Sequence, residues 1–308
     1  MSTSKKISSK VSIGMPVYNG EKRIRKAIES LLSQTHSDFE LIISDSASTD
    51  STSLICKEMA EKDQRIRYIR QRKKNSIYSD FNFVLKEAKN EYFVWAASDD
   101  IWRSDFLEKN LRVLESNDKL VGSIGLIRLF DESTEGTITD PHTVTSKFPP
   151  YERYTRTVQG SYKNKIKPYL DGFPNGLMIH AVYRTKKLQK RVVRHKLFNW
   201  DMAVVLNILH EGDLHVINEI LMYKYAYGVS ATTRSYIQMA LKYDVSVPEI
   251  MIGLYVPFTF WCLKNMGIGV FMENFSWFFR LNLKGWRIII MESIRLIKRT
   301  LCRQKKWW

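Results

Sequence analysis

Two adjacent carboxylates, Asp99 and Asp100, follow a short run of apolar and aromatic residues in the sequence Ala96-Ala-Ser-Asp-Asp-Ile101. Neighbouring acids repel each other, and holding them together is costly unless a cation joins them. Mg²⁺ and Mn²⁺ accept carboxylate oxygens, and they commonly complete their coordination with water and substrate phosphate. The pair therefore predicts a Mn²⁺ or Mg²⁺ site, with a solvated acidic turn as the alternative.

Two earlier segments, 15–21 and 44–50, also follow apolar runs and carry polar or aromatic side chains. In Met15-Pro-Val-Tyr-Asn-Gly-Glu21, Tyr18 offers a flat aromatic face to a base or a sugar. In Ser44-Asp-Ser-Ala-Ser-Thr-Asp50, Asp45 directly follows an apolar run, and Asp50 is well placed to cap a helix. Neither loop is specific alone, so its meaning depends on where the fold places it.

Short apolar runs alternate with amphipathic segments from residue 11 to about residue 127. The apolar runs predict strands at 11–15, 39–43, 66–69 and 92–96. The segments between them predict helices at 22–33, 51–62 and 77–89. This alternation is typical of an α/β fold with a mostly parallel central sheet and helices on both faces. Ligands bind outside the carboxyl ends of the strands in such sheets, which is where the three loops lie.

The pattern changes in the second half of the chain. Residues 131–175 are rich in Thr, Pro, Tyr and Lys, and they predict a long loop insertion without a clear helix. A strand is predicted at 176–183, a helix at 200–210 and one or two strands at 214–227. The chain is predicted to be helical from residue 231 onward.

The chain is strongly basic, with 48 Lys and Arg residues, 32 Asp and Glu residues and a net charge of +16. A hydrophobic content of 44% argues against wholesale disorder and a polytopic membrane bundle. Three widely spaced cysteines without a CxxC pair support neither a disulfide framework nor a thiolate zinc site. Residues 1–10 form a polar tail without the apolar stretch of a secretory signal, which predicts a cytoplasmic protein.

The basic excess gathers in residues 284–308, where eight basic side chains accompany one acid. The predicted helix has one apolar face and one polar face, with Trp286, Trp307 and Trp308 nearby, as in helices that lie in a membrane interface. The apolar face holds Ile290, Ile294, Ile297 and Leu301, and the polar face holds Glu292, Arg295, Arg299 and Arg303. We therefore predict peripheral attachment to an anionic inner membrane face. A basic helix packed on the domain, with a solvated outer face, is the alternative.

A membrane-spanning helix is not predicted. Residues 250–263 are uncharged, but Pro257 splits them and Lys264 follows them. The run is shorter than the roughly 20 apolar residues that a spanning helix needs.

The loops and their surroundings together resemble the family 2 inverting glycosyltransferases, which have the GT-A fold. The resemblance rests on Pro16-Val-Tyr-Asn19, the segment 33–50, Asn90-Glu-Tyr-Phe-Val-Trp-Ala96 and Ser98-Asp-Asp100. It covers roughly residues 10 to 225 and is densest before Asn117. The order and spacing of these motifs carry the resemblance, since none is specific alone.

The resemblance implies a nucleotide-binding role for several residues. Pro16 and Tyr18 match the loop that lines the base, with Tyr18 stacking on it, and Glu21 matches a frequent acid of the same loop. Asp45 matches the carboxylate that accepts an N–H of the uracil edge. Asn82 matches a recurrent position of the donor site.

The resemblance also implies the reacting groups. Asp99 would hold the ribose or a metal-bound water, and Asp100 would bind the metal. The base of this family is an acid at the start of a later helix. Asn199-Trp-Asp201 matches that position, so Asp201 is the predicted base that deprotonates the acceptor hydroxyl.

The acceptor side of the site is predicted from the segment 172–180, which resembles the acceptor-side segment of the family. Gly176 would permit close approach of the sugar, and His180 would face either the site or the core. Trp200 is also placed near the acceptor, at a position where an acid is common. Four basic residues after the third predicted strand either meet the diphosphate or form a solvated charge run: Arg70, Arg72, Lys73 and Lys74.

The residue pattern and the resemblance together divide the chain into three parts. A polar tail covers 1–10, a GT-A catalytic domain covers 11–230 and a helical C-terminal region covers 231–308. Within the domain, 11–127 would bind the nucleotide-sugar and 128–230 the acceptor.

The predicted activity is inverting transfer from a UDP-sugar to a hydroxyl of a glycan or lipid-linked glycan, in cell-surface polysaccharide or glycoconjugate biosynthesis. Two alternatives stay open. One is an inactive membrane scaffold of the same fold, which is supported by Ser44, where the resembling family often has an acid beside Asp45, and by Trp200, where an acid is common. The other is a nucleic-acid-binding protein, which is less favoured because the basic residues gather in a tryptophan-bearing tail and not in a groove-binding module.

Overall fold

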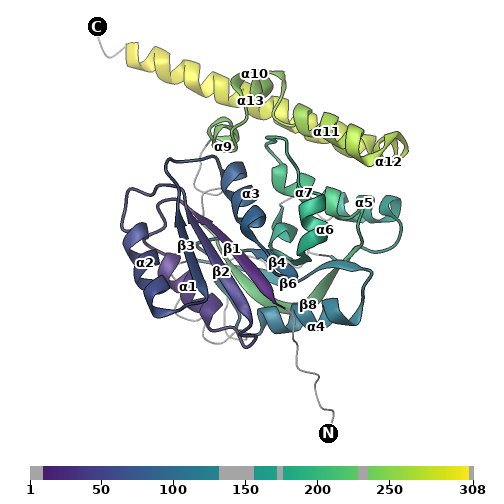
Figure 1. The fold of residues 1–308 in the computed structure, drawn as a ribbon. Coiled ribbons are helices and arrows are strands. Elements are labelled where there is room, and N and C mark those ends of the chain that lie inside the picture. Colours follow the sequence, from purple (N-terminus) through teal and green to yellow (C-terminus); the bar gives the residue numbers. More distant parts are fainter. Residues whose placement is uncertain (1–9, 132–155, 172–175, 228–234, 305–308) are drawn as a thin grey trace.

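The computed structural model describes residues 10–131, 156–171, 176–227 and 235–304 (Figure 1). The predicted polar tail up to residue 9 lies outside the described residues. So do 132–155 and 172–175 of the predicted insertion, and Trp307 and Trp308.

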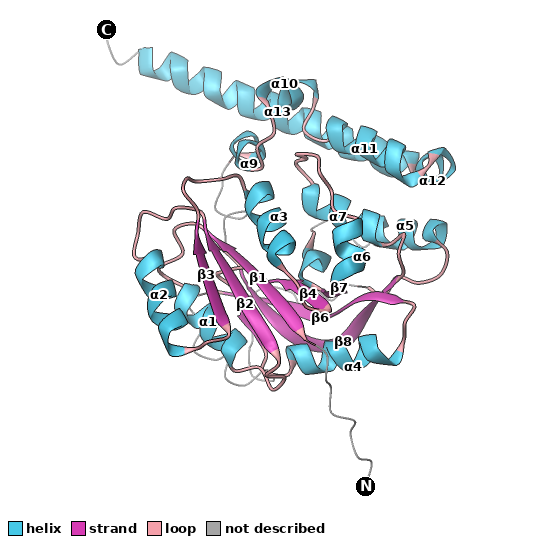
Figure 2. Ribbon diagram, viewed as in Figure 1, coloured by secondary structure: helices cyan, strands magenta, loops and turns pink. Residues whose placement is uncertain are grey.

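One eight-stranded sheet forms the centre of the fold, in the order β3-β2-β1-β4-β7-β6-β8-β5 (Figure 2). Its first half is parallel and consists of β1 (Val11–Val17), β2 (Phe39–Asp45), β3 (Ile66–Arg70) and β4 (Tyr92–Trp95). These strands confirm the four strands predicted from the apolar runs. The crossover helices predicted between them are also present, as α1 (Ile24–Leu32), α2 (Thr52–Lys62) and α3 (Ile77–Glu87).

The second half of the sheet is mixed. β7 (Val182–Arg184) runs antiparallel to both β4 and β6 (Leu120–Phe130). β8 (Asp213–Tyr225) runs parallel to β6, and the short β5 (Ile101–Trp102) is antiparallel to β8. Three further helices accompany these strands: α4 (Phe106–Ser116), α6 (Thr185–Lys190) and α7 (Trp200–Ile208).

Two predictions for the second half are wrong. The segment 176–183 is not one strand, because Gly176 has φ +65° and is followed by a 3-10 helix, η3 (Leu177–His180). The predicted insertion contains a helix, α5 (Tyr162–Asp171), which includes Pro168. Its polar composition and internal proline concealed it, and burial of Ile166 and Leu170 against the domain stabilises it.

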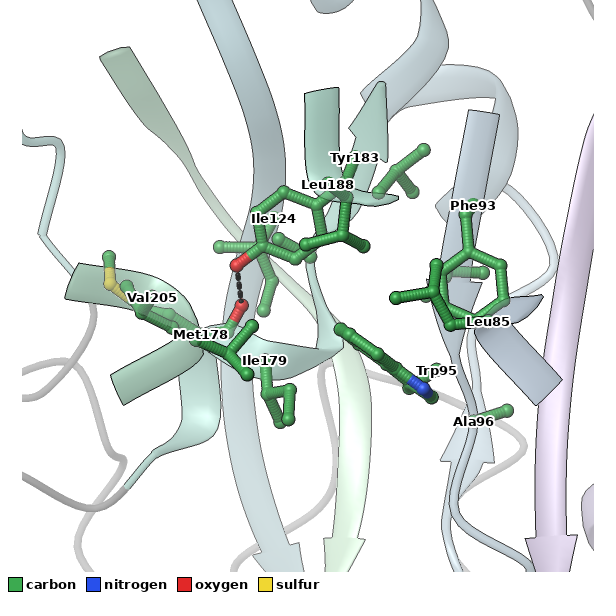
Figure 3. Close-up of a cluster of buried hydrophobic side chains, with 14 of the residues drawn as sticks. Leu85, Phe93, Trp95, Ala96, Ile124, Met178, Ile179, Tyr183, Leu188 and Val205 are labelled. Atoms are coloured by element: carbon green, nitrogen blue, oxygen red, sulfur yellow. Dashed lines mark hydrogen bonds between the residues drawn. The ribbon is translucent and has the colours of Figure 1, made fainter. Parts of the chain in front are cut away.

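A core of aromatic side chains supports the end of β4. Figure 3 shows Phe93 and Trp95 of β4 near Tyr183 of β7, whose hydroxyl donates a hydrogen bond to the carbonyl of Met178. The ring of Trp200 packs edge-on against Trp95, with ring centroids 5.9 Å apart. This packing holds the carboxyl end of β4 in place, four residues before the acid pair begins.

The helices α9 to α13, which we call the C-terminal layer, lie together beyond the domain (Figure 1). They are α9 (Tyr236–Lys242), α10 (Val247–Ile252), α11 (Val256–Met266), α12 (Ile268–Glu273) and the long α13 (Phe275–Gln304). α11 packs on α7, and the Trp277 indole donates to the carbonyl of Leu170 at 3.1 Å. None of the helices in the described ranges combines the length and apolarity that crossing a bilayer requires.

Candidate active site

A crevice is expected between β1 and β4, because the strand order reverses direction there. On the side of β1 that faces β4, the Gly14 carbonyl accepts a hydrogen bond from the Ala96 N–H, at 2.9 Å. The backbone nitrogen of Pro16, two residues later in β1, faces the same neighbour at a point beyond the end of β4. Its missing N–H therefore costs no ladder bond, and the two strands can separate.

The loops after β1 and β2 hold each other in place. The Glu21 N–H donates to Asp50 Oδ2 at 3.2 Å, and Glu21 Oε2 accepts from the Ser51 N–H at 2.9 Å. Asp50 Oδ1 also accepts the Thr52 N–H at 3.0 Å, so Asp50 stabilises the start of α2. In this structure Glu21 joins two loops of the predicted nucleotide site.

Tyr18 stays open to solvent at the tip of the first loop, with 38% of its surface exposed. Lys74 Nζ lies 4.0 Å from the centre of the ring, close enough for a cation–π contact. The ring is therefore accessible to a stacking base, and one of the predicted basic residues lies beside it.

Asp45 is fully buried at the end of β2. Its Oδ1 accepts the Ser48 N–H at 2.8 Å, while Oδ2 accepts the Tyr68 hydroxyl at 2.8 Å and lies 3.3 Å from Arg70 Nη1. Each oxygen already has a partner, so a uracil N–H would have to join or displace one of them. Arg70 is thus bound to the predicted base-recognition acid.

α3 carries two buried side-chain oxygens that accept no hydrogen bond from the part of the chain that the structure describes. They are Asp80 Oδ1 and Asn82 Oδ1. Burial raises the pKa of Asp80. Asn82 was predicted as a donor-site residue, whereas Asp80 was missed. The signal for Asp80 was an acid four residues before the buried Val84, on the apolar face of the helix.

Asp99 and Asp100 lie in the turn between β4 and β5. Asp100 is fully buried, and its Oδ1 accepts the Tyr225 N–H at 2.9 Å. Its Oδ2 has no hydrogen-bond partner among the described residues and lies 3.6 Å from Lys224 Nζ. Burial raises the pKa of Asp100, and burial together with the charge of Asp100 raises the pKa of Asp99 to about 6.

Lys224 was not among the predicted site residues. A lysine within an otherwise apolar and aromatic stretch of the predicted strand 214–227 was the only local signal for it. In the structure it forms an ion pair with Asp100, which lies far away in the sequence.

Asp201 is the second residue of α7, and burial raises its pKa. Its Oδ1 accepts the Met202 N–H at 2.8 Å. Tyr169 of α5 and Tyr243, which follows α9, lie near enough for the charge of Asp201 to add to the rise that burial causes in their pKa values. The predicted base therefore lies where the domain meets the C-terminal layer.

Gly176 approaches the predicted base directly. A Cβ built on Gly176 would lie 1.7 Å from Asp201 Oδ2, and the φ of +65° disfavours any side chain. We expect Gly176→Ala to displace Asp201 and to lower the rate of the sugar transfer that the resemblance implies by about tenfold or more, because small displacements of reacting groups are costly. Kinetics with a saturating donor would measure this loss.

Gly160→Ala is the matched control for Gly176→Ala. Gly160 also has a positive φ, of +99°, but its nearest neighbours would lie 3.9 Å from an added Cβ. Both variants carry backbone strain, and only one disturbs Asp201. Equal activity losses in the two variants would contradict the placement of Asp201 at the reacting centre.

His180 and Trp200, two predicted acceptor-side residues, are both buried. His180 Nδ1 lies 3.0 Å from the carbonyl of Trp95, which can only accept, so Nδ1 carries the proton and Nε2 has a lone pair. Burial, with the charge of Lys224, lowers the pKa of His180 to about 3, so the ring is neutral at pH 7. The Trp200 indole donates to the Val193 carbonyl at 3.2 Å and belongs to the core, with 1% of its surface exposed.

The acid pair fits a hard divalent ion that takes few protein ligands. Within the described ranges, no cluster of three or more His, Cys, Asp or Glu side chains could hold a metal by itself. Mg²⁺-type sites for nucleotides need only one or two carboxylates, with water and phosphate completing the shell. Asp100 Oδ2, which accepts no hydrogen bond within the described ranges, and the neighbouring Asp99 meet this requirement.

The sheet order and the acid pair that follows β4 are those of an α/β protein of the GT-A type. A family model described as "Glycosyl transferase family 2" matches residues 12–173, which is more than half of the chain. The chain therefore belongs to glycosyl transferase family 2, as the resemblance predicted.

Curated relatives share parts of the chain. A Methanococcus voltae protein named dolichyl N-acetyl-alpha-D-glucosaminyl phosphate 3-beta-D-2,3-diacetamido-2,3-dideoxy-beta-D-glucuronosyltransferase is 26% identical over 246 residues, covering 77% of this chain and 71% of that protein. Glycosyltransferase GlyG of Streptococcus pneumoniae is 32% identical over 127 residues, covering 41% of this chain and 42% of that protein. The matches to GlyG and to two further relatives span less than half of those proteins.

Among solved structures, S. aureus TarS 1–349 in complex with UDP-GlcNAc matches with a TM-score of 0.53 and 19% identity, covering 70% of this chain and 58% of that chain. At this level of identity the match supports the fold alone.

Proposed function

We propose that the protein is an inverting glycosyltransferase that moves a sugar from a UDP-sugar to an acceptor hydroxyl with the help of Mn²⁺ or Mg²⁺. One observation carries this proposal. Asp201 lies far from Asp99 and Asp100 in the sequence, but the ring of its neighbour Trp200 packs against Trp95 of β4, the strand that leads into the acid pair, with ring centroids 5.9 Å apart. Lys224 Nζ lies 3.6 Å from Asp100, and its charge opposes the rise that burial causes in the pKa of all three acids. The site thus joins an acid pair suited to a metal with a separate acid suited to act as a base.

The donor would lie across the crevice between β1 and β4. Tyr18 would stack on the base, Asp45 would accept an N–H of the uracil, and Asn82 Oδ1 is available as a further acceptor. Asp100 and Asp99 would hold the divalent ion, which would stabilise the charge of the departing diphosphate.

Asp201 would accept the proton of the acceptor hydroxyl as that oxygen attacks the anomeric carbon. Burial raises its pKa and so makes its carboxylate a stronger base than an exposed aspartate. His180, which is neutral, and Gly176 would border the acceptor. Attack from the side opposite the leaving diphosphate inverts the anomeric configuration.

The names of related proteins support the donor and acceptor classes. The M. voltae relative is named as a glycosyltransferase that acts on a dolichyl-phosphate-linked sugar, and the solved TarS complex contains UDP-GlcNAc. We therefore propose a glycan or lipid-linked glycan acceptor, in polysaccharide or glycoconjugate biosynthesis.

Calorimetric titration of UDP and GDP, with Mn²⁺ and then with EDTA, tests the donor site. We expect binding that needs the metal and favours UDP, because Asp100 and Asp45 would contact different ends of the nucleotide. If folded protein bound neither nucleotide, the inactive-scaffold alternative would replace the proposal.

We also propose that the C-terminal layer attaches the protein to an anionic membrane surface, on the cytoplasmic face. α13 exposes a stripe of apolar side chains at helical spacing: Phe275, Phe279, Leu283, Trp286, Ile290 and Ile294. Exposed basic side chains flank this stripe: Arg280, Lys284, Arg287 and Arg295. Apolar residues beside a basic row are typical of helices that lie in a lipid interface.

The opposite face of α13 binds the rest of the layer. Glu292, which was assigned to the polar face, is buried against α9 and accepts hydrogen bonds from Ser235 Oγ and the Tyr236 N–H. The apolar stripe therefore faces outward. A second copy of this chain is a less suitable partner, because two such helices would bring like-charged basic rows together.

The variant Phe275→Ser/Phe279→Ser/Trp286→Ser tests membrane attachment. We expect about tenfold or greater loss of binding to phosphatidylserine-containing vesicles in a flotation assay, because three large apolar side chains no longer enter the interface. High salt should also weaken the binding of the unmodified protein.

Leu54→Ser is the control for this experiment, because Leu54 is 71% exposed but lies on α2 of the catalytic domain. It should bind vesicles like the unmodified protein. Absence of vesicle binding, together with a dimer that the triple variant dissociates, would contradict the membrane proposal.

A further inference from the structure

Lys224 lies beside the acid pair because two distant strands are paired. Ile101 of β5 pairs with Tyr223 of β8 in antiparallel register, so the residues just outside this pair, Asp100 and Lys224, are neighbours. The Tyr225 N–H donates to Asp100 Oδ1 and holds the carboxylate in this position. The backbone therefore determines that an ammonium group accompanies Asp100.

The contact between the two charges is an ion pair without a close hydrogen bond. Lys224 Nζ and Asp100 Oδ2 are 3.6 Å apart, longer than an ordinary charged hydrogen bond. The Asp100 side chain is fully buried, whereas 25% of the Lys224 side chain is exposed. Among the described residues the carboxylate oxygen thus keeps a lone-pair direction for another ligand, and the Lys224 side chain is partly exposed to solvent.

The charge of Lys224 acts on three acids of the site. Burial raises the pKa of Asp99, Asp100 and Asp201, and the positive charge of Lys224 opposes that rise in each of them. A buried carboxylate is costly without a counter-charge. Lys224 supplies that charge when no other cation is present.

We infer that Lys224 is the resident counter-cation of Asp100, and that it moves from this carboxylate to the diphosphate of the donor when a divalent ion binds Asp100. The inference rests on the proposed function. Two cations at one carboxylate repel each other, and the flexible stem of lysine allows the ammonium group to swing to a nearby anion. Lys224 would thus weaken the binding of the divalent ion when no nucleotide is bound. It would strengthen the binding of the nucleotide once the ion is bound.

This exchange predicts effects of opposite sign when the charge is removed. In Lys224→Met we expect Mn²⁺ alone to bind about tenfold more tightly, and UDP at saturating Mn²⁺ to bind about tenfold more weakly, which lies in the usual range of coupling between sites. Free Mn²⁺ measured by electron paramagnetic resonance gives the first affinity, and calorimetry gives the second. Unchanged or weaker binding of Mn²⁺ alone to the variant would overturn the inference.

Two further variants make the experiment decisive. Lys242→Met removes an exposed lysine of α9 and should change neither affinity. Lys224→Gln retains a hydrogen-bonding group next to Asp100 and should show the same two opposite changes. It replaces Lys224→Met if circular dichroism shows that Lys224→Met does not fold.

If the unmodified protein binds neither Mn²⁺ nor UDP, the proposed donor site and this inference are both wrong. If it binds both and the Lys224 variants match it, only the inference falls.

Discussion

Asp201→Asn is expected to lower kcat by about 10²–10⁴-fold, the usual contribution of a positioned general base. The amide cannot accept the proton of the acceptor hydroxyl, yet it keeps the shape of the carboxylate and can still accept the Met202 N–H. UDP affinity in Mn²⁺ should stay within about twofold, because Asp201 acts only in the transition state. A transfer assay and calorimetry on the same preparation would separate the two effects.

The pH dependence provides a second test of the same residue. Burial raises the pKa of Asp201 above the ordinary aspartate value, and the base is active only as the carboxylate. Activity should therefore be present above the raised pKa and be lost as the pH falls through it. In Asp201→Asn the part of this decline that comes from Asp201 should disappear, whereas protonation of Asp99 and Asp100, whose pKa values burial also raises, should still lower the residual activity at acidic pH. A variant with a near-normal rate would show that another group is the base.

Asp100→Asn is expected to lower metal-supported transfer by about 10²–10³-fold, because the ion contributes several kcal/mol of charge stabilisation at the diphosphate. Its amide oxygen can still accept the Tyr225 N–H, so the turn between β4 and β5 should keep its shape. Mn²⁺ and UDP affinities should fall together. Transfer rates measured across a Mn²⁺ titration would show whether the loss follows the metal.

Asp118→Asn is the control for this variant. The Asp118 side chain is fully exposed, and its ion pair is with Arg184, away from the acid pair. The substitution changes the net charge by the same amount and should leave Mn²⁺ and UDP binding unaltered. Asp100→Asn with normal Mn²⁺-dependent activity would contradict the assignment of Asp100 to the metal.

The strands and helices of the first half of the chain could be predicted because the residue patterns that specify them lie within each segment. Apolar runs of strand length and helical spacing identified β1 to β4 and the helices between them, and the topology rule then placed Tyr18, Asp45 and the acid pair at one edge of the sheet. α5 was missed because its helical state depends on burial against the domain, whereas its Pro168 and polar residues argue against a helix.

The acids proposed for the chemistry could be chosen from the sequence: Asp99 and Asp100 follow a predicted strand, and Asp201 matches a position of the resembling family at the start of a predicted helix. Their surroundings could not be predicted, because they depend on how distant segments pack. The approach of Gly176 to Asp201 depends on a positive φ and on the packing of η3 against α7. The pairing of Lys224 with Asp100 depends on the register between β5 and β8. Strand register and side-chain packing join residues that are distant in sequence, and no local pattern of residue types encodes which pairs will meet.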